Sequence, residues 1–226
     1  MMRFSAAIAA QPAVIPDIKC VSPKEGDLLR GRDPVEVARQ LVAWGAPVLS
    51  VVTESRHFGG SPELLRAIAR QTGAPVLRKD FIKTRGQLEE TLALGASAVL
   101  LIAAGVDEAT LAALYQTALQ LGLEPLVEVC TAEEMQLAST LGARLVGINN
   151  RNIQTLELDD GGPARTAQLA QLAPKHAVLI SESGIVTAED AKIAMQAGAH
   201  AILVGTVLWQ AADMKETYQR LREAIA

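Results

Sequence analysis

The 226-residue sequence lacks the marks of several classes of protein. It has only two cysteines, Cys20 and Cys130, whose separation fits no metal-binding motif and suggests no disulfide framework. No apolar run approaches the roughly 18 residues that cross a bilayer, and the net charge of −4 comes without a basic stripe. The N-terminal segment lacks the long apolar core of a signal peptide, so we interpret it as a lead-in to the first strand. These absences predict a cytoplasmic protein without nucleic-acid, membrane or metal partners.

A helix that ends at glycine, followed by a short apolar strand, recurs along the chain. The pattern occurs in WGAPVLSVV, TGAPVLR, LGASAVLLI, LGLEPLVEV, LGARLVGI and AGAHAILVG. Glycine just after a helix is a common left-handed C-cap. The strands are continuous runs of Val, Leu and Ile rather than alternating ones, which is typical of a parallel sheet covered on both faces.

Helix starts are marked as well, by Asp33-Pro34 and by a capping-box pattern from Thr131 to Glu134. We predict strands near 14–19, 47–52, 75–78, 98–102, 125–129, 144–148, 177–181 and 201–205. We predict helices near 34–44, 62–71, 85–94, 107–121, 132–141, 163–172, 188–197 and 208–225. Eight strand–helix units predict a single (β/α)8 TIM-barrel domain over residues 1–226. An open doubly wound sheet is the alternative, but the chain has no dinucleotide-binding glycine motif.

The stretch VIPDIKCVSP places a carboxylate, Asp17, and an ammonium, Lys19, two residues apart at the end of an apolar run. Residues i and i+2 of a strand share a face, and burying such charges is costly unless they are paired or used. Active sites of barrels lie at the carboxyl ends of the strands, where later strands add Lys79, Glu128 and Glu182. A solvated ring of ion pairs is possible, but five such charges at one end favour an acid–base site.

Two further groups of residues follow the strands at the same end. Ser183-Gly184 and Gly205-Thr206 lie in the last two strand–helix loops, where barrels often bind phosphate, so we predict a phosphorylated small-molecule substrate. Two of the three phenylalanines, Phe58 and Phe81, fall in earlier loops at the same end of the barrel, which suggests a slot for an aromatic ring. The residues predicted for this slot are Pro23, Phe58, Phe81, Leu100 and Leu156. We expect no carboxylate partner for His57.

Six motifs in order, IKCVSPKEG, HFGGS, VLRKDFI, LVEV, GINNRN and ISESGI, resemble the indole-3-glycerol-phosphate synthase family from about residue 14 to about residue 213. That family of lyases in tryptophan biosynthesis closes the pyrrole ring of 1-(2-carboxyphenylamino)-1-deoxyribulose 5-phosphate, releases carbon dioxide and water, and needs no cofactor.

The resemblance implies a role for each matched residue. Lys79 would be the general acid at the reacting carbonyl carbon, Lys19 would bind the substrate carboxylate, and Glu128 would be a general base. Asn149 and Glu182 would bind substrate hydroxyls and orient the lysines. The phosphate and the nearby substrate atoms would be held by Ser22, Arg151, Ser183, Gly184, Gly205 and Thr206.

The chain departs from the family at two places. Asp17 stands where the family has glutamate, which shortens the reach by about 1.5 Å. Only about a dozen residues precede the first strand, so most of the family's extra N-terminal helix is expected to be missing. These departures leave a diverged paralogue that acts on a related sugar phosphate as the alternative to an active synthase. A non-catalytic phosphate binder is disfavoured because it would need no acid and base. We expect a monomer or a weak homodimer.

Overall fold

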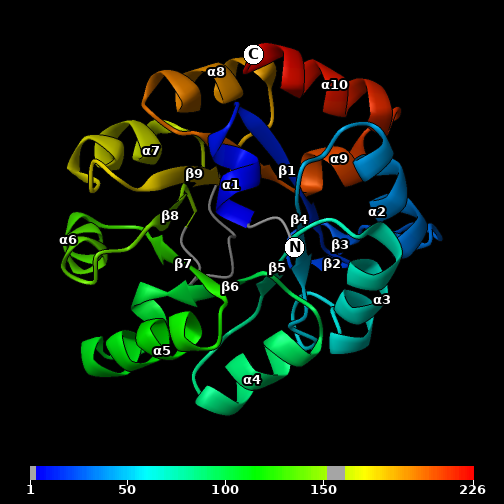
Figure 1. The fold of residues 1–226 in the computed structure, drawn as a ribbon. Coiled ribbons are helices and arrows are strands. Elements are labelled where there is room, and N and C mark those ends of the chain that lie inside the picture. Colours follow the sequence, from blue (N-terminus) through cyan, green and yellow to red (C-terminus); the bar gives the residue numbers. More distant parts are fainter. Residues whose placement is uncertain (1–3, 152–160) are drawn as a thin grey trace.

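The computed structural model describes residues 4–151 and 161–226, and in them eight parallel strands close into a barrel (Figure 1). The strands are β1 (Ala13–Ile18), β4 (Leu49–Val52), β5 (Val76–Lys79), β6 (Ala98–Ile102), β7 (Glu124–Val129), β8 (Leu145–Asn149), β9 (Val178–Glu182) and β10 (Ala201–Val204). Each strand pairs with its neighbours along the chain, and β10 closes the ring against β1. The predicted TIM barrel is confirmed.

Helices surround the barrel between successive strands (Figure 1). They are α2 (Pro34–Ala43), α3 (Pro62–Thr72), α4 (Arg85–Ala93), α5 (Glu108–Gln120), α6 (Ala132–Thr140), α7 (Ala164–Leu169), α8 (Ala188–Gln196), α9 (Thr206–Gln210) and α10 (Met214–Ala224). Short 3-10 turns, η1 (Ala103–Gly105) and η3 (Ala170–Leu172), follow β6 and α7. None of the helices within the described ranges has the length and apolarity that a membrane span requires.

Side-chain caps explain where several helices begin. The Asp33 side chain accepts from the backbone N–H of Val35, with proline in the first turn, as predicted. Thr131 likewise caps α6, but Glu134 accepts from the N–H of Cys130 at 2.6 Å instead of completing the predicted capping box. Each cap satisfies a backbone donor that a helix start leaves unpaired.

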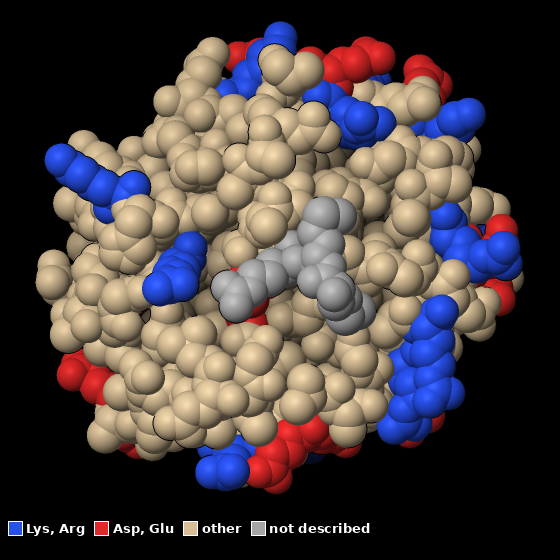
Figure 2. All heavy atoms as spheres, viewed as in Figure 1, with Lys and Arg blue, Asp and Glu red and all other residues tan. Residues whose placement is uncertain are grey.

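The segment before β1 is a helix, α1 (Phe4–Ala9), and not the predicted strand lead-in. Phe4 and Ile8 are buried against residues that open the strands, such as Ala98, and Ser5 hydrogen-bonds to Glu124 at the start of β7. α1 therefore lies across the amino-terminal end of the barrel, opposite the carboxyl ends of the strands (Figure 1). In the same view, charged side chains of both signs lie mostly around the edge of this face (Figure 2).

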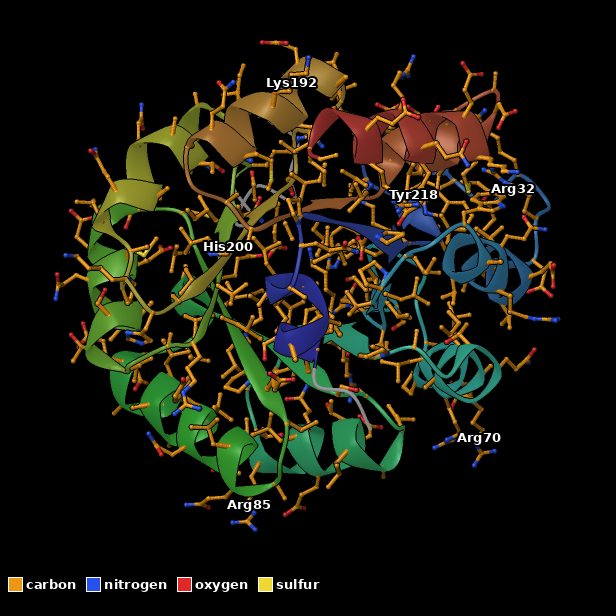
Figure 3. The ribbon with its side chains drawn as sticks, turned by 45° about the horizontal axis from the view of Figure 1, so that its top comes forward. Arg32, Arg70, Arg85, Lys192, His200 and Tyr218 are labelled. Carbon is orange, nitrogen blue, oxygen red and sulfur yellow. The ribbon has the colours of Figure 1, made fainter. Side chains whose placement is uncertain are left out.

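The predicted helix over 208–225 is two helices, α9 and α10, because Ala211 is extended and Asp213 caps a new helix by accepting from the N–H of Glu216. Both helices pack on β1: Trp209 donates to the carbonyl of Asp17 at 2.9 Å, and Tyr218 lies buried between α10 and the barrel (Figure 3). A two-stranded hairpin, β2 (Val21–Ser22) and β3 (Gly26–Asp27), was also absent from the prediction.

Candidate active site

Two adjoining cavities open at the carboxyl ends of the strands. The apolar cavity, of about 420 Å³, is bordered by β1, β4, β5, β6 and β7, and the polar cavity, of about 750 Å³, lies between β1, β9 and β10. Asp17, Lys19 and Lys79 line both cavities. These three charged residues therefore lie where two halves of one elongated ligand would meet.

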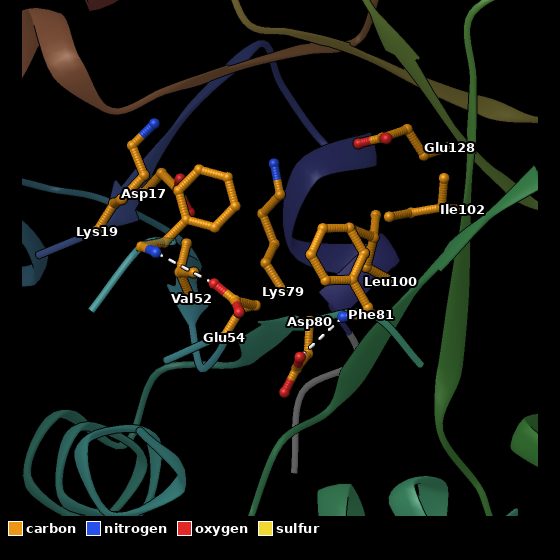
Figure 4. Close-up of a pocket in the computed structure, with 11 residues that line it drawn as sticks. Asp17, Lys19, Val52, Glu54, Lys79, Asp80, Phe81, Leu100, Ile102 and Glu128 are labelled. Atoms are coloured by element: carbon orange, nitrogen blue, oxygen red, sulfur yellow. Dashed lines mark hydrogen bonds between the residues drawn. The ribbon is translucent and has the colours of Figure 1, made fainter. Parts of the chain in front are cut away.

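The apolar cavity contains most of the predicted aromatic slot. Phe58, Phe81 and Leu100 line it, as do Val52 and Ile102. Glu128, which is only 2% exposed, also lines it (Figure 4). Its position beside an apolar slot fits a ring-binding site with one acid–base group.

Two of the residues predicted for the slot are not placed there. Pro23 does not line the apolar cavity. Leu156 lies outside the described residues.

The polar cavity brings together the residues predicted for phosphate. Arg151, Ser183, Gly184, Gly205 and Thr206 line it. Ser183 has φ of 61° and Gly184 of 68°, so the turn runs through two left-handed residues. A Cβ on Gly184 would overlap the backbone of Gly162, so only glycine fits there. Ser183 is not a glycine, so its left-handed backbone costs about 1–3 kcal/mol. Strained residues of this kind are typical of ligand sites.

The loop after β1 departs from the expectation for this cavity. Ser22 does not line it; the Ser22 hydroxyl lies 3.4 Å from the N–H of Glu25 and accepts from it. Glu25 does line it, and its carboxylate accepts from Gln210 at 2.8 Å. An acidic side chain beside a phosphate site was not anticipated from the sequence.

Lys79 lies in the centre of the mouth, between Lys19 and Asp17 on one side and Glu128 on the other (Figure 4). Its ammonium is 3.0 Å from Oε2 of Glu182, whose side chain is fully buried. The register partner of Glu182 on β8 is Asn149, and the carboxylate has room because the residue two positions earlier is Gly147, where any Cβ would overlap Oε1. The sequence predicted both charged residues but not the glycine that makes room for the pair.

Asp17 and Lys19 have separate contacts. Asp17 accepts a hydrogen bond of 2.6 Å from the hydroxyl of Ser50, its register partner on β4. The Lys19 ammonium lies 5.4 Å from the centre of the Phe58 ring, close enough for a cation–π interaction. Both residues are less than one-tenth exposed, and their contacts with different elements fit a binding site better than a simple structural bridge.

Asn149 lies at the end of β8, beside Glu182 on β9. Its Oδ1 accepts from the N–H of Arg151 at 3.0 Å, while its buried Nδ2 has no hydrogen-bond partner among residues 4–151 and 161–226. Burying an amide donor in this way is unfavourable. The arrangement therefore suits an amide that donates to a ligand hydroxyl, although Asn149 lines neither cavity.

Asn150, which was not predicted, organises the turn at the polar cavity. Its Nδ2 donates to the carbonyls of Glu182 and Ser183 and to the Ser181 hydroxyl, each at 3.0 Å. Its Oδ1 accepts from the N–H and the hydroxyl of Thr166. The doubled asparagine in GINNRN was the available signal, since one of two adjacent amides must point away from the site.

Two more carboxylates line the apolar cavity, Glu54 and Asp80; both follow strand ends in the sequence, but neither was among the predicted site residues. Glu54 accepts from three backbone N–H groups of its own loop and contacts His57 Nδ1 at 3.3 Å, so the expectation that His57 has no carboxylate partner was wrong. Asp80 is held by Arg78, a buried arginine on the outward face of β5. Among the described side chains, no group of three or more His, Cys, Asp or Glu residues could hold a metal ion.

Comparisons with a family model and with individual proteins give the same family name. A model of the family "Indole-3-glycerol phosphate synthase" matches residues 2–221. The protein of that name from Thermococcus kodakarensis is 45% identical over 215 residues, which cover 95% of this chain and 94% of that protein. The protein of that name from Kineococcus radiotolerans is 46% identical over 200 residues, covering 88% of this chain and 72% of that protein.

Solved structures agree on the fold. The 3-hexulose-6-phosphate synthase from Salmonella typhimurium superposes with a TM-score of 0.75 at 15% identity, covering 94% of this chain and 98% of that one. The thiamine phosphate pyrophosphorylase from Pyrococcus furiosus gives 0.67 at 17% identity, covering 97% and 96%. At such identities the likeness concerns the fold alone.

Proposed function

The chain belongs to the indole-3-glycerol phosphate synthase family, and from this premise we propose how its site carries out the family's reaction. The substrate is 1-(2-carboxyphenylamino)-1-deoxyribulose 5-phosphate. The ring carbon that bears the carboxylate attacks the ketone carbon, the carboxylate leaves as carbon dioxide, and the former ketone oxygen leaves as water. The product is indole-3-glycerol phosphate, a precursor in tryptophan biosynthesis.

The observation that carries the proposal is the pair of cavities joined at three charged residues. The substrate has an aromatic ring at one end and a phosphate at the other, with the reacting carbons between them. The apolar cavity suits the ring and the polar cavity suits the phosphate. Lys19, Lys79 and Asp17 then lie beside the atoms that react.

The first half of the reaction falls to the two lysines. Lys79 donates a proton to the ketone oxygen as the new carbon–carbon bond forms, and Glu182, 3.0 Å away, holds its ammonium in place. Lys19 binds the substrate carboxylate and, through its contact with Phe58, keeps that group beside the ring. Placing both reactants in one geometry supplies much of the rate enhancement.

The second half falls to Lys79, Glu128 and Asn149. Lys79, reprotonated from solvent, donates the proton with which the hydroxyl departs as water, while Glu128 removes a proton from the adjacent carbon that bears the nitrogen. The place of Glu128 among apolar side chains suits a general base. Asn149 donates its Nδ2 to a hydroxyl of the sugar chain. Ser183, Gly184, Gly205 and Thr206 hold the phosphate, with Arg151 nearby. No cofactor or metal takes part in this scheme.

We further propose that the protein works in the cytoplasm as a monomer or weak homodimer, without nucleic-acid or membrane partners. The scarcity of cysteine and the absence of a basic stripe support this. Sedimentation across a range of protein concentrations tests the oligomeric state, and a tight dimer or larger assembly would contradict it.

Turnover of the carboxyphenylamino-deoxyribulose phosphate, followed by the fluorescence of the indole product, tests the function. We expect product formation with release of one carbon dioxide per turnover. A protein that binds the reduced substrate analogue without turning the substrate over would support the diverged paralogue, for which Asp17 is the favouring observation. A protein that neither binds nor turns over these compounds would contradict the proposal.

A further inference from the structure

Two carboxylates in the apolar cavity each hold the backbone of a phenylalanine that lines it. Oε2 of Glu54 accepts from the N–H of Phe58 at 3.1 Å, and Oδ1 of Asp80 accepts from the N–H of Phe81 at 2.8 Å (Figure 4). Both carboxylates follow the end of a barrel strand, so each connects the rigid barrel to one aromatic wall of the cavity.

Glu54 makes the larger set of contacts. Its Oε1 accepts from the N–H of Arg56 at 2.9 Å, and its Oε2 accepts from the N–H of His57 at 2.8 Å as well as from Phe58. The residue is only 8% exposed. Burial raises the pKa of its carboxyl, but the backbone N–H donors and the contact with His57 outweigh burial and hold the pKa below its usual range. A carboxylate engaged in this way is poorly suited to exchange protons with a substrate.

The loop that Glu54 organises is fixed at other points as well. The carbonyl of Glu54 accepts from the N–H of Gly60 at 2.8 Å, and the carbonyl of Phe58 accepts from Val21 in β2 at 3.0 Å. Gly60 approaches the carbonyl of Val52 so closely that a Cβ would overlap it. The loop therefore has both ends anchored, and the Glu54 side chain fills its centre.

The aromatic face that results is shared with the catalytic centre. Phe58 is 6% exposed, and its ring centre lies 5.4 Å from the Lys19 ammonium. A shift of the loop would move both the wall for the aromatic ring and a contact of the lysine assigned to the substrate carboxylate. Displacements of about 1 Å at such positions are enough to affect turnover.

We propose that Glu54 is a positioning residue that holds Phe58 against the aromatic end of the substrate, while taking no part in proton transfer. This inference rests on the proposed function for the identity of the ligand, but not for the contacts of the loop. Glu54 thereby differs from Asp17 and Glu128, two other carboxylates of the apolar cavity, which the proposed reaction places beside the substrate.

Glu54→Gln tests the inference, because glutamine keeps the size of the side chain while replacing one acceptor oxygen with a donor that faces backbone N–H groups. The first readout is hydrogen exchange at the amides of residues 56–58, which we expect to become about tenfold faster. The second is steady-state kinetics, in which we expect KM to rise about tenfold with kcat changed less than threefold. Inhibition by inorganic phosphate, for which the polar cavity is the proposed site, is expected to stay the same.

Glu63→Gln is the matched control, since Glu63 is an exposed carboxylate in the helix that follows the same loop. It should leave exchange, KM and kcat unchanged. Unaltered exchange at residues 56–58 in Glu54→Gln would overturn the inference. So would a fall in kcat at constant KM, because that result would place Glu54 in the chemistry.

The inference can still be tested if Glu54→Gln does not fold or if the parent protein has no activity. If Glu54→Gln does not fold, Glu54→Asp takes its place, because the shorter carboxylate keeps its charge but reaches fewer of the three N–H groups. Changes in the same direction support the inference, and unchanged exchange and KM overturn it. If the parent protein turns over no substrate, the proposed function fails, and the exchange measurement alone decides whether Glu54 holds the loop.

Discussion

The Lys79 ammonium lies 3.0 Å from a Glu182 carboxylate that has no exposed surface. The two residues come from β5 and β9, on different sides of the barrel. Such a pair requires space inside the ring of strands, and Gly147 on β8 provides it. The position of the proposed general acid therefore depends on a residue that touches no substrate.

Gly147→Ala tests this dependence. The added methyl group must displace the Glu182 carboxylate, so we expect kcat to fall about tenfold or more and the free energy of unfolding to fall by about 1–3 kcal/mol. Gly86→Ala is the control, because a Cβ added at Gly86 in α4 would meet no atom closer than 4.0 Å. It should stabilise the helix by about 0.5–1 kcal/mol without changing kcat. Unchanged kcat in Gly147→Ala would show that Glu182 does not position Lys79.

Asn150→Ala removes the amide that holds the left-handed turn at Ser183. The Glu182 carbonyl and the Ser181 and Thr166 hydroxyls that it satisfies belong to buried residues, so we expect the free energy of unfolding to fall by about 1–3 kcal/mol. We also expect inhibition by inorganic phosphate to weaken about tenfold, because the turn lines the polar cavity. Loss of stability without any change in phosphate inhibition would limit Asn150 to a structural role.

Ser50 and Asp17 are expected to act as one unit, because the Ser50 hydroxyl donates to the Asp17 carboxylate at 2.6 Å inside the barrel. Ser50→Ala and Asp17→Asn should each lower kcat/KM, and the double variant should be little worse than Asp17→Asn alone. A double-mutant cycle measures this coupling, for which we expect about 1 kcal/mol or more. Additive effects would mean that Ser50 does not set the position of Asp17.

Glu54 contributes to the pH dependence of stability. Its folded-state pKa lies below the ordinary value of 4.5, so its stabilising contribution is complete above that pH and is lost as the pH falls through the folded pKa. The groups around it are His57 and the cavity residues Asp17, Lys19, Lys79, Asp80 and Glu128. Urea unfolding of the parent and Glu54→Gln should differ more at about pH 6 than at about pH 3.5. A difference that is constant with pH would contradict the lowered pKa.

The architecture could be predicted because its signals are local. Capped helix starts, glycine after six of the helices and continuous apolar strands repeat along the chain, and each can be recognised without knowledge of the fold. The charged residues at the mouth followed from the same pattern, since the ends of parallel strands meet. The break before α10 was also marked, by Asp213 three residues before Glu216, but the apolar stripe of the segment obscured it.

The features that were missed depend on contacts between distant segments. The α1 segment is six residues long, and its helix is stabilised by packing of Phe4 and Ile8 on the barrel end. The roles of Glu54 and Asn150 could not be separated from those of the catalytic groups by residue type. Their partners are backbone groups of a loop and a turn, which only the folded chain brings together.

The N-terminal departure no longer distinguishes this chain from its family, because the Thermococcus kodakarensis protein that carries the family name is matched over 94% of its length. Asp17 is the departure that still bears on activity.

The proposal that Lys79 is the general acid is tested most directly by kcat for the parent and for Lys79→Met. Methionine has a side chain of similar length but carries no ammonium. We expect kcat to fall by about 10²–10⁴-fold while the reduced substrate analogue still binds, and we expect the melting temperature to fall as well, because the buried Glu182 carboxylate loses the Lys79 ammonium. A Lys79→Met protein with kcat close to that of the parent would contradict the assignment of Lys79 as the general acid.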